Sequence, residues 1–294
     1  MLRDSKPFHF IHLRKIWYIL SIVLLAPAIV SIFVQGFNLG VDFTGGSLLE
    51  VRFNQQVTIE QVREVMSEFG LGGDPIQQSD VNEFIIRTKE LDEETEVAIM
   101  QTFDEKCGEN ILLRNERVGP KIGQELVRNA FMAFLAALVL ILIYIAWRFE
   151  LKQGIATIIS LFHDALLVLG VFSIFQIEVD GKFVAAILII IGYSLNDRIV
   201  IFDRIRENRI YRKKGEDLAE VINNSIWQTM ARSINTALAV LFVVVALYVL
   251  GGSTLQNMTF AIMIGVVVGV YSSLSNASPL WYDLKRLEGQ SGVR

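Results

Sequence analysis

The sequence predicts a multi-pass α-helical membrane protein, with six transmembrane helices and a small α+β domain outside the membrane between the first two. The chain of 294 residues is 52% hydrophobic, and its mean hydropathy of +0.45 is high for a soluble protein. Its charged residues avoid several apolar runs, each close to the roughly 20 residues that cross a bilayer as a helix. One long polar segment separates the first two runs.

The apolar runs are the expected spans. They cover residues 16–34, 130–147, 155–175, 184–202, 231–250 and 258–280, and the last five form a helical bundle over residues 124–284. The first run is longer than the apolar part of an ordinary signal peptide, and no small-residue cleavage site follows it, so we interpret it as a retained anchor. The sixth run is interrupted by serines, Asn276 and Pro279, but it is long enough to cross.

Positive charge in the short loops predicts the orientation of the chain. Lysine and arginine are frequent before the first run, after the second and fourth runs, and at the C-terminus, whereas residues 176–182 hold one lysine and residues 251–257 hold no charge. We therefore expect residues 1–15 and 285–294 to be cytoplasmic. The basic residues between 204 and 214 could also bind anionic lipid or a cytosolic partner, although a role in topology is the simpler interpretation.

The polar segment, residues 35–123, is acidic and has the pattern of a small extracytoplasmic α+β domain. Strand-like patterns occur near 47–53, 74–79, 84–88 and 111–114, and helical spacing of apolar residues occurs over 58–69 and 92–107. The second helix should place Val97, Ile99, Met100 and Phe103 near one face. This β-α-β-β-α-β order is typical of a ferredoxin-like arrangement. Cys107 has no partner for a disulfide within the chain, and the segment shows no catalytic or metal-ligand pattern, so we interpret it as a binding or lever domain.

Asp197 lies inside the fourth apolar run, where a carboxylate is costly unless it is paired, hydrated or protonated. From position alone, a proton-binding role and a structural ion pair are equally good interpretations. His163 and Asp164 lie near the middle of the third run. Because neighbouring helical residues point about 100° apart, we expect these two side chains not to bond to each other. They could belong to a proton relay or form hydrogen bonds between helices.

Three sequence patches carry a family resemblance. They are GVDFTGG at residues 40–46, VGPKIG at 118–123, and GYSLND at 192–197 followed by DRIREN at 203–208. Together with the spans and the outer domain, they resemble the SecF-type subunits of the SecD/SecF family of bacterial protein export over the whole chain. The matching residues of the last patch are Gly192, Tyr193, Ser194, Asn196, Asp203, Arg204, Arg206, Glu207 and Asn208.

The resemblance implies a fold of the resistance-nodulation-division type in the inner cell membrane. It implies an accessory role in the Sec translocase that, with SecD, uses the proton gradient to promote late steps of protein export. The implied partners are SecD, the SecYEG channel, the translocating preprotein and membrane lipid, without nucleic acid. No cofactor beyond the proton gradient is expected. Because the sequence carries no Walker-type phosphate loop and no nucleophile–base set, we do not expect an enzyme.

The resemblance also implies roles for individual residues. Asp197 is expected to bind and release a proton, with Arg232 facing the proton pathway and partnering a carboxylate. Asp164 and His163 are further candidates for the relay. Arg232 could instead be a snorkelling side chain that marks the interface. The expected coupling motif between the first span and the outer domain is Asp42, Thr44, Gly45 and Gly46, whose glycines suit left-handed or tight backbone.

Two features depart from the family pattern. Arg198 stands where the family commonly has a small residue after the aspartate, and it could either act on Asp197 or point toward the interface without effect. In the sixth span, Val270, Ser275 and Asn276 depart from the usual residues. The same span carries small residues every fourth position, which offer a close-packing face to another helix inside or outside the subunit. These small residues are Ala261, Gly265, Gly269, Ser273 and Ala277.

Two other functions remain open from the sequence. Half of a proton-driven small-molecule exporter of the same superfamily should carry a larger outer domain with a ligand cleft. A passive scaffold for translocon assembly should tolerate neutralisation of Asp197. Both expectations differ from those for a subunit that is driven by protons.

Overall fold

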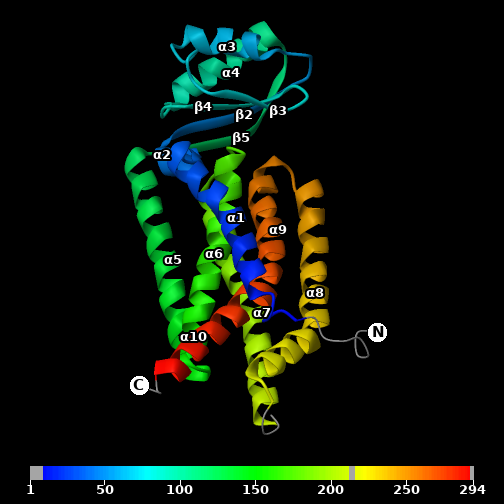
Figure 1. Cartoon of the computed structure of the whole chain (residues 1–294). Helices are drawn as coiled ribbons and strands as arrows, with labels where there is room; N and C mark the ends of the chain where they lie inside the picture. Colours follow the sequence, from blue (N-terminus) through cyan, green and yellow to red (C-terminus); the bar gives the residue numbers. More distant parts are fainter. Residues whose placement is uncertain (1–8, 212–215, 292–294) are drawn as a thin grey trace. The chain divides into compact units, whose positions relative to one another are not determined.

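A computed structural model describes residues 9–211 and 216–291 of the chain. The chain forms two compact units (Figure 1). One unit contains the residues up to Asn38 and from Met132 onward, and the other contains Leu39–Phe131. This second unit begins four residues after and ends eight residues after the expected outer domain, residues 35–123.

The unit Leu39–Phe131 is built on one antiparallel sheet. Its strands lie in the order β3-β4-β2-β5, and every neighbouring pair is antiparallel. The elements in chain order are α2 (Val41–Thr44), β2 (Gly46–Phe53), α3 (Ile59–Glu68), β3 (Ile76–Asp80), β4 (Glu83–Thr88), α4 (Glu93–Cys107) and β5 (Asn110–Val118). The short strand β1 (Asn38–Leu39) precedes them.

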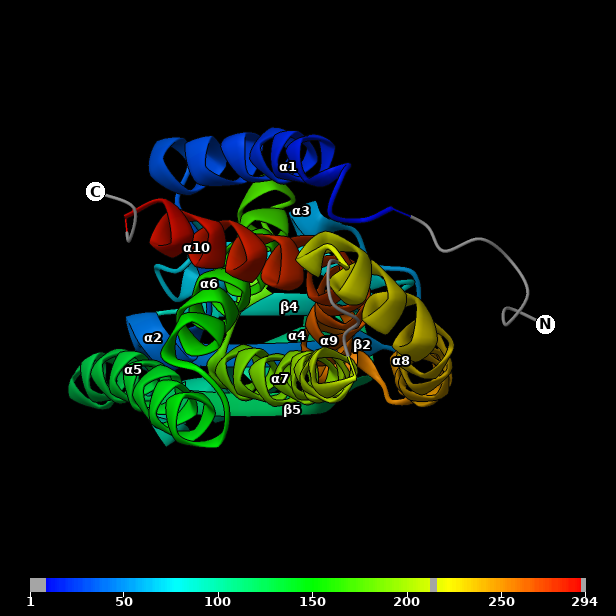
Figure 2. The ribbon, with the colours of Figure 1, turned by 60° about the horizontal axis from the view of Figure 1, so that its bottom comes forward.

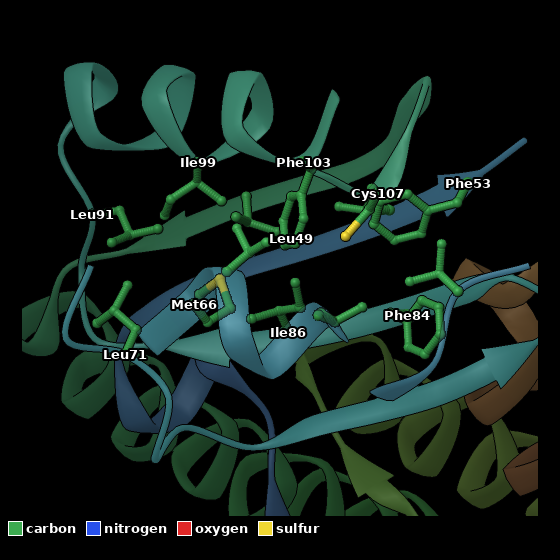
Figure 3. Packing of buried hydrophobic residues seen from close by; sticks show 14 residues of the cluster. Leu49, Phe53, Met66, Leu71, Phe84, Ile86, Leu91, Ile99, Phe103 and Cys107 are labelled. Atoms are coloured by element: carbon green, nitrogen blue, oxygen red, sulfur yellow. The ribbon is translucent and has the colours of Figure 1, made fainter. Parts of the chain in front are cut away.

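The core of this unit lies between the sheet and the helices α3 and α4 (Figure 3). Alternate residues of β2, namely Leu49, Val51 and Phe53, point into it, because side chains of a strand alternate between its two faces. Ile99 and Phe103 of α4 cover them, because residues four positions apart lie on the same face of a helix.

The expectation that Val97 shares the buried face of α4 is wrong. Its side chain is 50% exposed. Val97 precedes Ile99 by two residues, and this spacing turns it by about 200° around the helix. Cys107, one turn beyond Phe103, is buried and extends the core face instead.

The other unit is a bundle of long helices. Its elements are α1 (Arg14–Val34), α5 (Pro120–Arg148, of which the part from Met132 belongs here), α6 (Leu151–Ile174), β6 (Glu178–Val179), α7 (Gly181–Ile210), α8 (Leu218–Leu250), α9 (Ser253–Ser272), a π-helix (Ser273–Ala277) and α10 (Ser278–Ser291). Within the described ranges, six helices are long and apolar enough to cross a membrane, if α9 and its continuation to Leu287 are counted as one.

Several helices extend beyond the expected spans. The second, fourth and fifth spans were expected at 130–147, 184–202 and 231–250, whereas α5 begins at Pro120, α7 ends at Ile210 and α8 begins at Leu218. Hydropathy detects only the apolar part of a helix. Arginine, glutamate and glutamine are good helix formers, so a helix continues into charged sequence where the apolar run stops.

The central helix of the bundle is α6. It packs against α1 on one side and against α7 and α9 on the other, and Figure 2 shows α1 and α7 on opposite sides of it. Much of the surface of α1 and α8 is apolar and exposed, including Phe33 and Phe242. Such surfaces suit contact with lipid or with another membrane helix.

The small-residue stripe, which runs along α9 and continues into the π-helix, packs inside the bundle. Gly265 lies against Ile190 of α7, and Gly269 lies against Ser194 one turn further along α7. All five residues of the stripe are buried. The close-packing face that the sequence left open to another subunit is therefore used within this chain.

Candidate functional site

Asp197 lies in the buried interior of the bundle, on the side of α7 that faces α8. Its side-chain Oδ1 accepts a hydrogen bond from the hydroxyl of Ser233 on α8. Its Oδ2 is buried and has no hydrogen-bond partner among the described residues. The hydroxyls of Ser194 and Ser273 are also buried without a full hydrogen bond in this part of the chain, and the hydroxyl of Ser273 is close enough to interact with the Asp197 carboxylate. One carboxylate oxygen therefore remains available for a proton.

Arg198 makes its hydrogen bonds toward α6 and α9 and not to Asp197, although its charge also acts on that neighbouring aspartate. Its Nη2 donates to Asp164 Oδ2 at 2.6 Å, to Ser272 Oγ at 2.7 Å and to Ser160 Oγ at 2.9 Å. The side chains of Arg198 and Asp164 are 0% and 1% exposed. The alternative that Arg198 points to the interface is wrong, because an opposite charge on the third span holds it in the interior.

His163 and Asp164 do bond to each other, contrary to the expectation from their adjacent positions. His163 Nδ1 lies 3.2 Å from Asp164 Oδ1. The directions of two Cβ atoms about 100° apart do not prevent this contact, because rotation about the side-chain bonds turns both groups toward the same interior space. The observed bond thus makes His163 a direct neighbour of the Arg198–Asp164 pair.

A polar chain continues from His163 toward α1. His163 Nε2 lies 3.4 Å from Asn276 Nδ2, and Asn276 Nδ2 donates to Ser21 Oγ at 2.9 Å. The hydroxyl of Tyr271 lies 3.0 Å from the same serine. Asn276, one of the departures in the sixth span, therefore links the π-helix to both α1 and α6. A cavity of about 290 Å³ beside it is lined mainly by apolar side chains of α1 and α6.

Arg232 does not pair directly with a carboxylate. Its residue is exposed, and it forms no ion pair with any residue that the structure describes. It borders an open groove of about 450 Å³ between α7 and α8, together with Asn196, Asp203 and Thr229. Its charge nevertheless acts on Asp197 across the helix pair. The structure thus places Arg232 near the Asp197 carboxylate without a direct ion pair, and its role in the proton pathway stays a prediction.

The family-motif residues divide between the interior and the end of α7. Ser194 is buried, Gly192 and Asn196 are exposed, and Tyr193 is half-buried. At the end of the helix, Asn208 Nδ2 donates to Ser225 Oγ at 2.8 Å. Asn208 Nδ2 and Arg204 both donate to Gln228 of α8, Arg204 also bonds Glu207, and Arg148 lies 3.5 Å from Asp203. Arg206 is exposed. The contacts to Ser225 and Gln228 hold the end of α7 against α8, and the contact to Arg148 joins it to α5.

Glu150 connects three helices at the same end of the bundle. Its carboxylate accepts bonds from Arg209 on α7 and Lys285 on α10, both at 2.8 Å. Burial raises the pKa of Glu150, but the two cations outweigh burial and hold the pKa below its usual value. The carboxylate is therefore ionised at neutral pH and joins the α5–α6 turn to two other helices.

The coupling motif forms a tight turn at the start of β2. Asp42 and Thr44 belong to α2, and Thr44 Oγ1 donates to the carbonyl of Gly40 at 3.2 Å. Gly45 and Gly46 have φ values of +75° and +120°, which suit glycine. A Cβ at Gly46 would overlap the carbonyl of Thr88. The glycines thus let this segment enter the sheet directly.

Sequence reasoning did not identify Ser233 as a partner of Asp197 or Ser160 as a partner of Arg198. One sequence feature could have predicted the buried ion pair: Arg198 and Asp164 carry opposite charges, and both lie inside apolar runs. Two such charges are expected to pair when their helices pack together. The described residues contain no cluster of histidine, cysteine, aspartate and glutamate that could hold a metal ion.

Comparisons with known proteins agree over almost the whole chain. The model "Protein export membrane protein SecD/SecF, C-terminal" matches residues 98–287, and the SecD/SecF GG motif matches residues 30–57. The protein translocase subunit SecF of Acidaminococcus fermentans is 41% identical over 288 residues, covering 96% of this chain and 98% of the relative. The SecF subunit of Haemophilus influenzae is 39% identical, covering 94% and 85%.

A solved structure has the same fold. The crystal structure of SecDF from Thermus thermophilus, a translocon-associated membrane protein, matches with a TM-score of 0.89 and 37% identity. The match covers 97% of this chain and 40% of the SecDF chain. This chain therefore corresponds to nearly the full length of the SecF relatives and to less than half of SecDF.

Proposed function

Because this chain belongs to the SecD/SecF family of protein-export membrane proteins, we propose that it is an accessory subunit of the Sec translocase. In this role it works with a SecD subunit and uses the proton gradient to promote late steps of protein export. Near-complete coverage of SecF relatives and the match to a translocon-associated SecDF structure support the role. The further partners of the proposal are the SecYEG channel, the translocating preprotein and membrane lipid.

The proposal includes the placement of the chain. The chain is a multi-pass membrane protein, and we propose that both termini are cytoplasmic, as the loop charges favour. We also propose that the unit Leu39–Phe131 is a ferredoxin-like domain outside the membrane, which its antiparallel order β3-β4-β2-β5 supports. The subunit in this proposal is not an enzyme and needs no cofactor other than the proton gradient.

Asp197 is the proposed proton carrier. The observation that carries this assignment is the buried Oδ2, which has no hydrogen-bond partner in the described part of the chain. An ionised carboxylate in that position is costly, whereas a protonated one is not, so a local change in solvation or charge changes its proton affinity. Arg232, Asp164 and His163 are proposed to set the charge around it.

The substitution Asp197→Asn tests the proposal. Asparagine has nearly the same shape but cannot bind and release a proton at this position. We expect the variant to insert, to copurify with its SecD partner, and to lose gradient-dependent stimulation of precursor release from inverted membrane vesicles. Asp217→Asn is the matched control, because Asp217 caps α8 and asparagine caps a helix equally well. Wild-type stimulation by Asp197→Asn would reject the proton role and favour a scaffold.

A further inference from the structure

The ion pair between Arg198 and Asp164 is sealed inside the helical bundle. The two side chains are almost fully buried and lie 2.6 Å apart. The same guanidinium nitrogen also bonds to Ser160 and Ser272, so the pair joins α6, α7 and α9. Removing one charge from such a pair leaves the other uncompensated, whereas removing both can be nearly neutral.

The two buried aspartates have unlike surroundings. Asp164 has a guanidinium at hydrogen-bond distance and His163 on its other oxygen. Asp197 has a hydrogen bond from Ser233, the hydroxyl of Ser273 nearby, and no cation at hydrogen-bond distance among the described residues. We call Asp164, Asp197, Arg198 and His163 the buried set. If His163 is neutral, the positive charge of Arg198 balances one of the two carboxylates. One proton on the other carboxylate then brings the net charge of the set to zero.

The groups that face this set come from each neighbouring helix. Tyr193 lies on α7, one turn before Asp197, and that aspartate is influenced by the charges of Arg198 on the same helix and Arg232 on α8. Next to His163, Tyr271 approaches from α9, with ring centroids 6.3 Å apart. The π-helix and α1 present the neutral groups of Asn276 and Ser21. Among the residues that the structure describes around this set, Arg198 is thus the one buried cation in contact with a carboxylate.

We infer that Arg198 is the fixed counter-charge of Asp164, which keeps Asp164 ionised and outside the proton cycle and leaves Asp197 as the buried carboxylate that binds the proton. This inference rests on the proposed proton-driven function. In each cycle the carboxylate of Asp197 gains one proton and later releases it, and no other bond is made or broken. Arg198 is therefore a positioning residue, because it acts through Asp164 and does not carry the proton.

The first test compares single and paired substitutions in the complex with its SecD partner, in native membranes. Asp164→Asn and Arg198→Gln each leave one unpaired buried charge, so each should lose gradient-dependent stimulation of precursor release. The double variant Asp164→Asn/Arg198→Gln removes both charges and should recover stimulation to within about twofold of wild type. Lys182→Gln is the matched control, since it neutralises a partly exposed cation on the same helix, away from the buried pair.

The second test identifies the carboxyl group that takes up the proton. Infrared difference spectra of the purified complex in lipid vesicles, recorded between alkaline and acidic pH, detect the carbonyl stretch of a protonated carboxylic acid. We expect one such band from the buried set. Asp197→Asn should remove it, and Asp164→Asn/Arg198→Gln should keep it. In Arg198→Gln, a second band should appear and should be absent from the double variant.

The outcomes separate this inference from the function on which it rests. If Asp197→Asn keeps full stimulation, the proton-driven function itself fails. If Asp197→Asn loses stimulation but the double variant is also inactive despite normal assembly with SecD, then Asp164 is needed for itself and the inference is wrong. Loss of the carboxylic acid band in the double variant would overturn it as well. If a single variant fails to accumulate, the double variant and the infrared spectra still test whether Arg198 acts only as the counter-charge of Asp164.

Discussion

Gly265 of α9 lies directly against the side chain of Ile190 of α7, so closely that a Cβ at Gly265 would overlap that isoleucine. The next small residue of the stripe, Gly269, makes the same kind of approach to Ser194. These contacts bring α9 up to the helix that carries Asp197 and Arg198. Small residues provide such close packing between membrane helices, where lipid supplies little hydrophobic driving force.

The variant Gly265→Leu should therefore loosen the contact between α7 and α9. We expect a destabilisation of about 1–3 kcal/mol, the usual cost of an overpacked core, and a lower thermal midpoint of the detergent-solubilised protein. Gly192→Ala is the control, because a Cβ there meets nothing within 4 Å. Equal midpoints for wild type and Gly265→Leu would show that the helices can separate at no cost.

The hydrogen bond from Ser233 to Asp197 should matter for function more than for folding. Hydrogen bonds to charged groups contribute about 1.5–3 kcal/mol, which corresponds to a loss of tenfold or more in gradient-driven stimulation for Ser233→Ala. Ser233→Thr keeps the hydroxyl and should retain most of the stimulation. The assay is precursor release from vesicles at a fixed gradient. Equal activity of the alanine and threonine variants would argue against a role for this bond.

Glu150 should make the bundle sensitive to acid. Its pKa is lower in the folded protein than in the unfolded chain, so its stabilising contribution is present above the unfolded value of about 4.3 and is lost as the pH falls through the folded pKa. The carboxylate is a third exposed, and we expect Glu150→Gln to cost up to about 1 kcal/mol at pH 7.

Thermal unfolding of wild type and Glu150→Gln at pH 7 and at strongly acidic pH checks this expectation. The difference between the two proteins should be largest at pH 7 and should vanish in acid. Glu207→Gln serves as the control, because the Glu207 side chain is 53% exposed in its ion pair with Arg204. A difference that grew in acid would contradict the sign of the pKa shift.

Cys107 should report on the opening of the unit Leu39–Phe131. It is the single cysteine of the sequence and is buried in the core of that unit, and burial raises the pKa of its thiol. A thiol reagent should therefore react more than about tenfold faster with the urea-unfolded protein than with the native one, since the thiolate is the reactive form. Equal rates would show that the core opens freely.

The same shift predicts alkaline sensitivity of this unit. A raised folded pKa means that stability is fully present below the unfolded thiol pKa of about 8.5 and declines as the pH rises through the folded value. Cys107→Ala should not show this decline. The comparison is thermal unfolding at pH 7 and pH 10, and a larger alkaline loss in Cys107→Ala than in wild type would contradict the prediction.

Local patterns in the sequence were sufficient for much of the fold. The alternation of Leu49, Val51 and Phe53 and the four-residue spacing of Ile99 and Phe103 reflect contacts with a single sheet or helix face, and these are properties of neighbouring residues. The position of Val97 shows the limit of this reasoning, because an apolar residue near a core face is not necessarily on it. Helix ends such as Ile210 lie in charged sequence that hydropathy does not register.

The site was less predictable, because its contacts join residues far apart in the sequence. Asp164 and Arg198 are separated by 34 positions, and their pairing depends on how α6 and α7 pack. The presence of titratable groups in the membrane could be predicted from composition alone, since each such group is costly there. Whether Asp164 or Asp197 contacts Arg198, and which of them contacts Ser233, depends on the rotation of each helix about its axis. The pattern of apolar residues does not determine this rotation.

The π-helix at Ser273–Ala277 determines which face of the following helix, α10, is turned toward α1. A π-turn holds an extra residue compared with an α-turn, so its loss would rotate α10 by about 100° relative to α9. Asp283 of α10 accepts the hydroxyl of Tyr18 at 3.0 Å and pairs with Arg14 at 2.9 Å, both on α1. Deletion of one residue in this segment would turn Asp283 away from both, so the length of the segment is constrained as strictly as its composition.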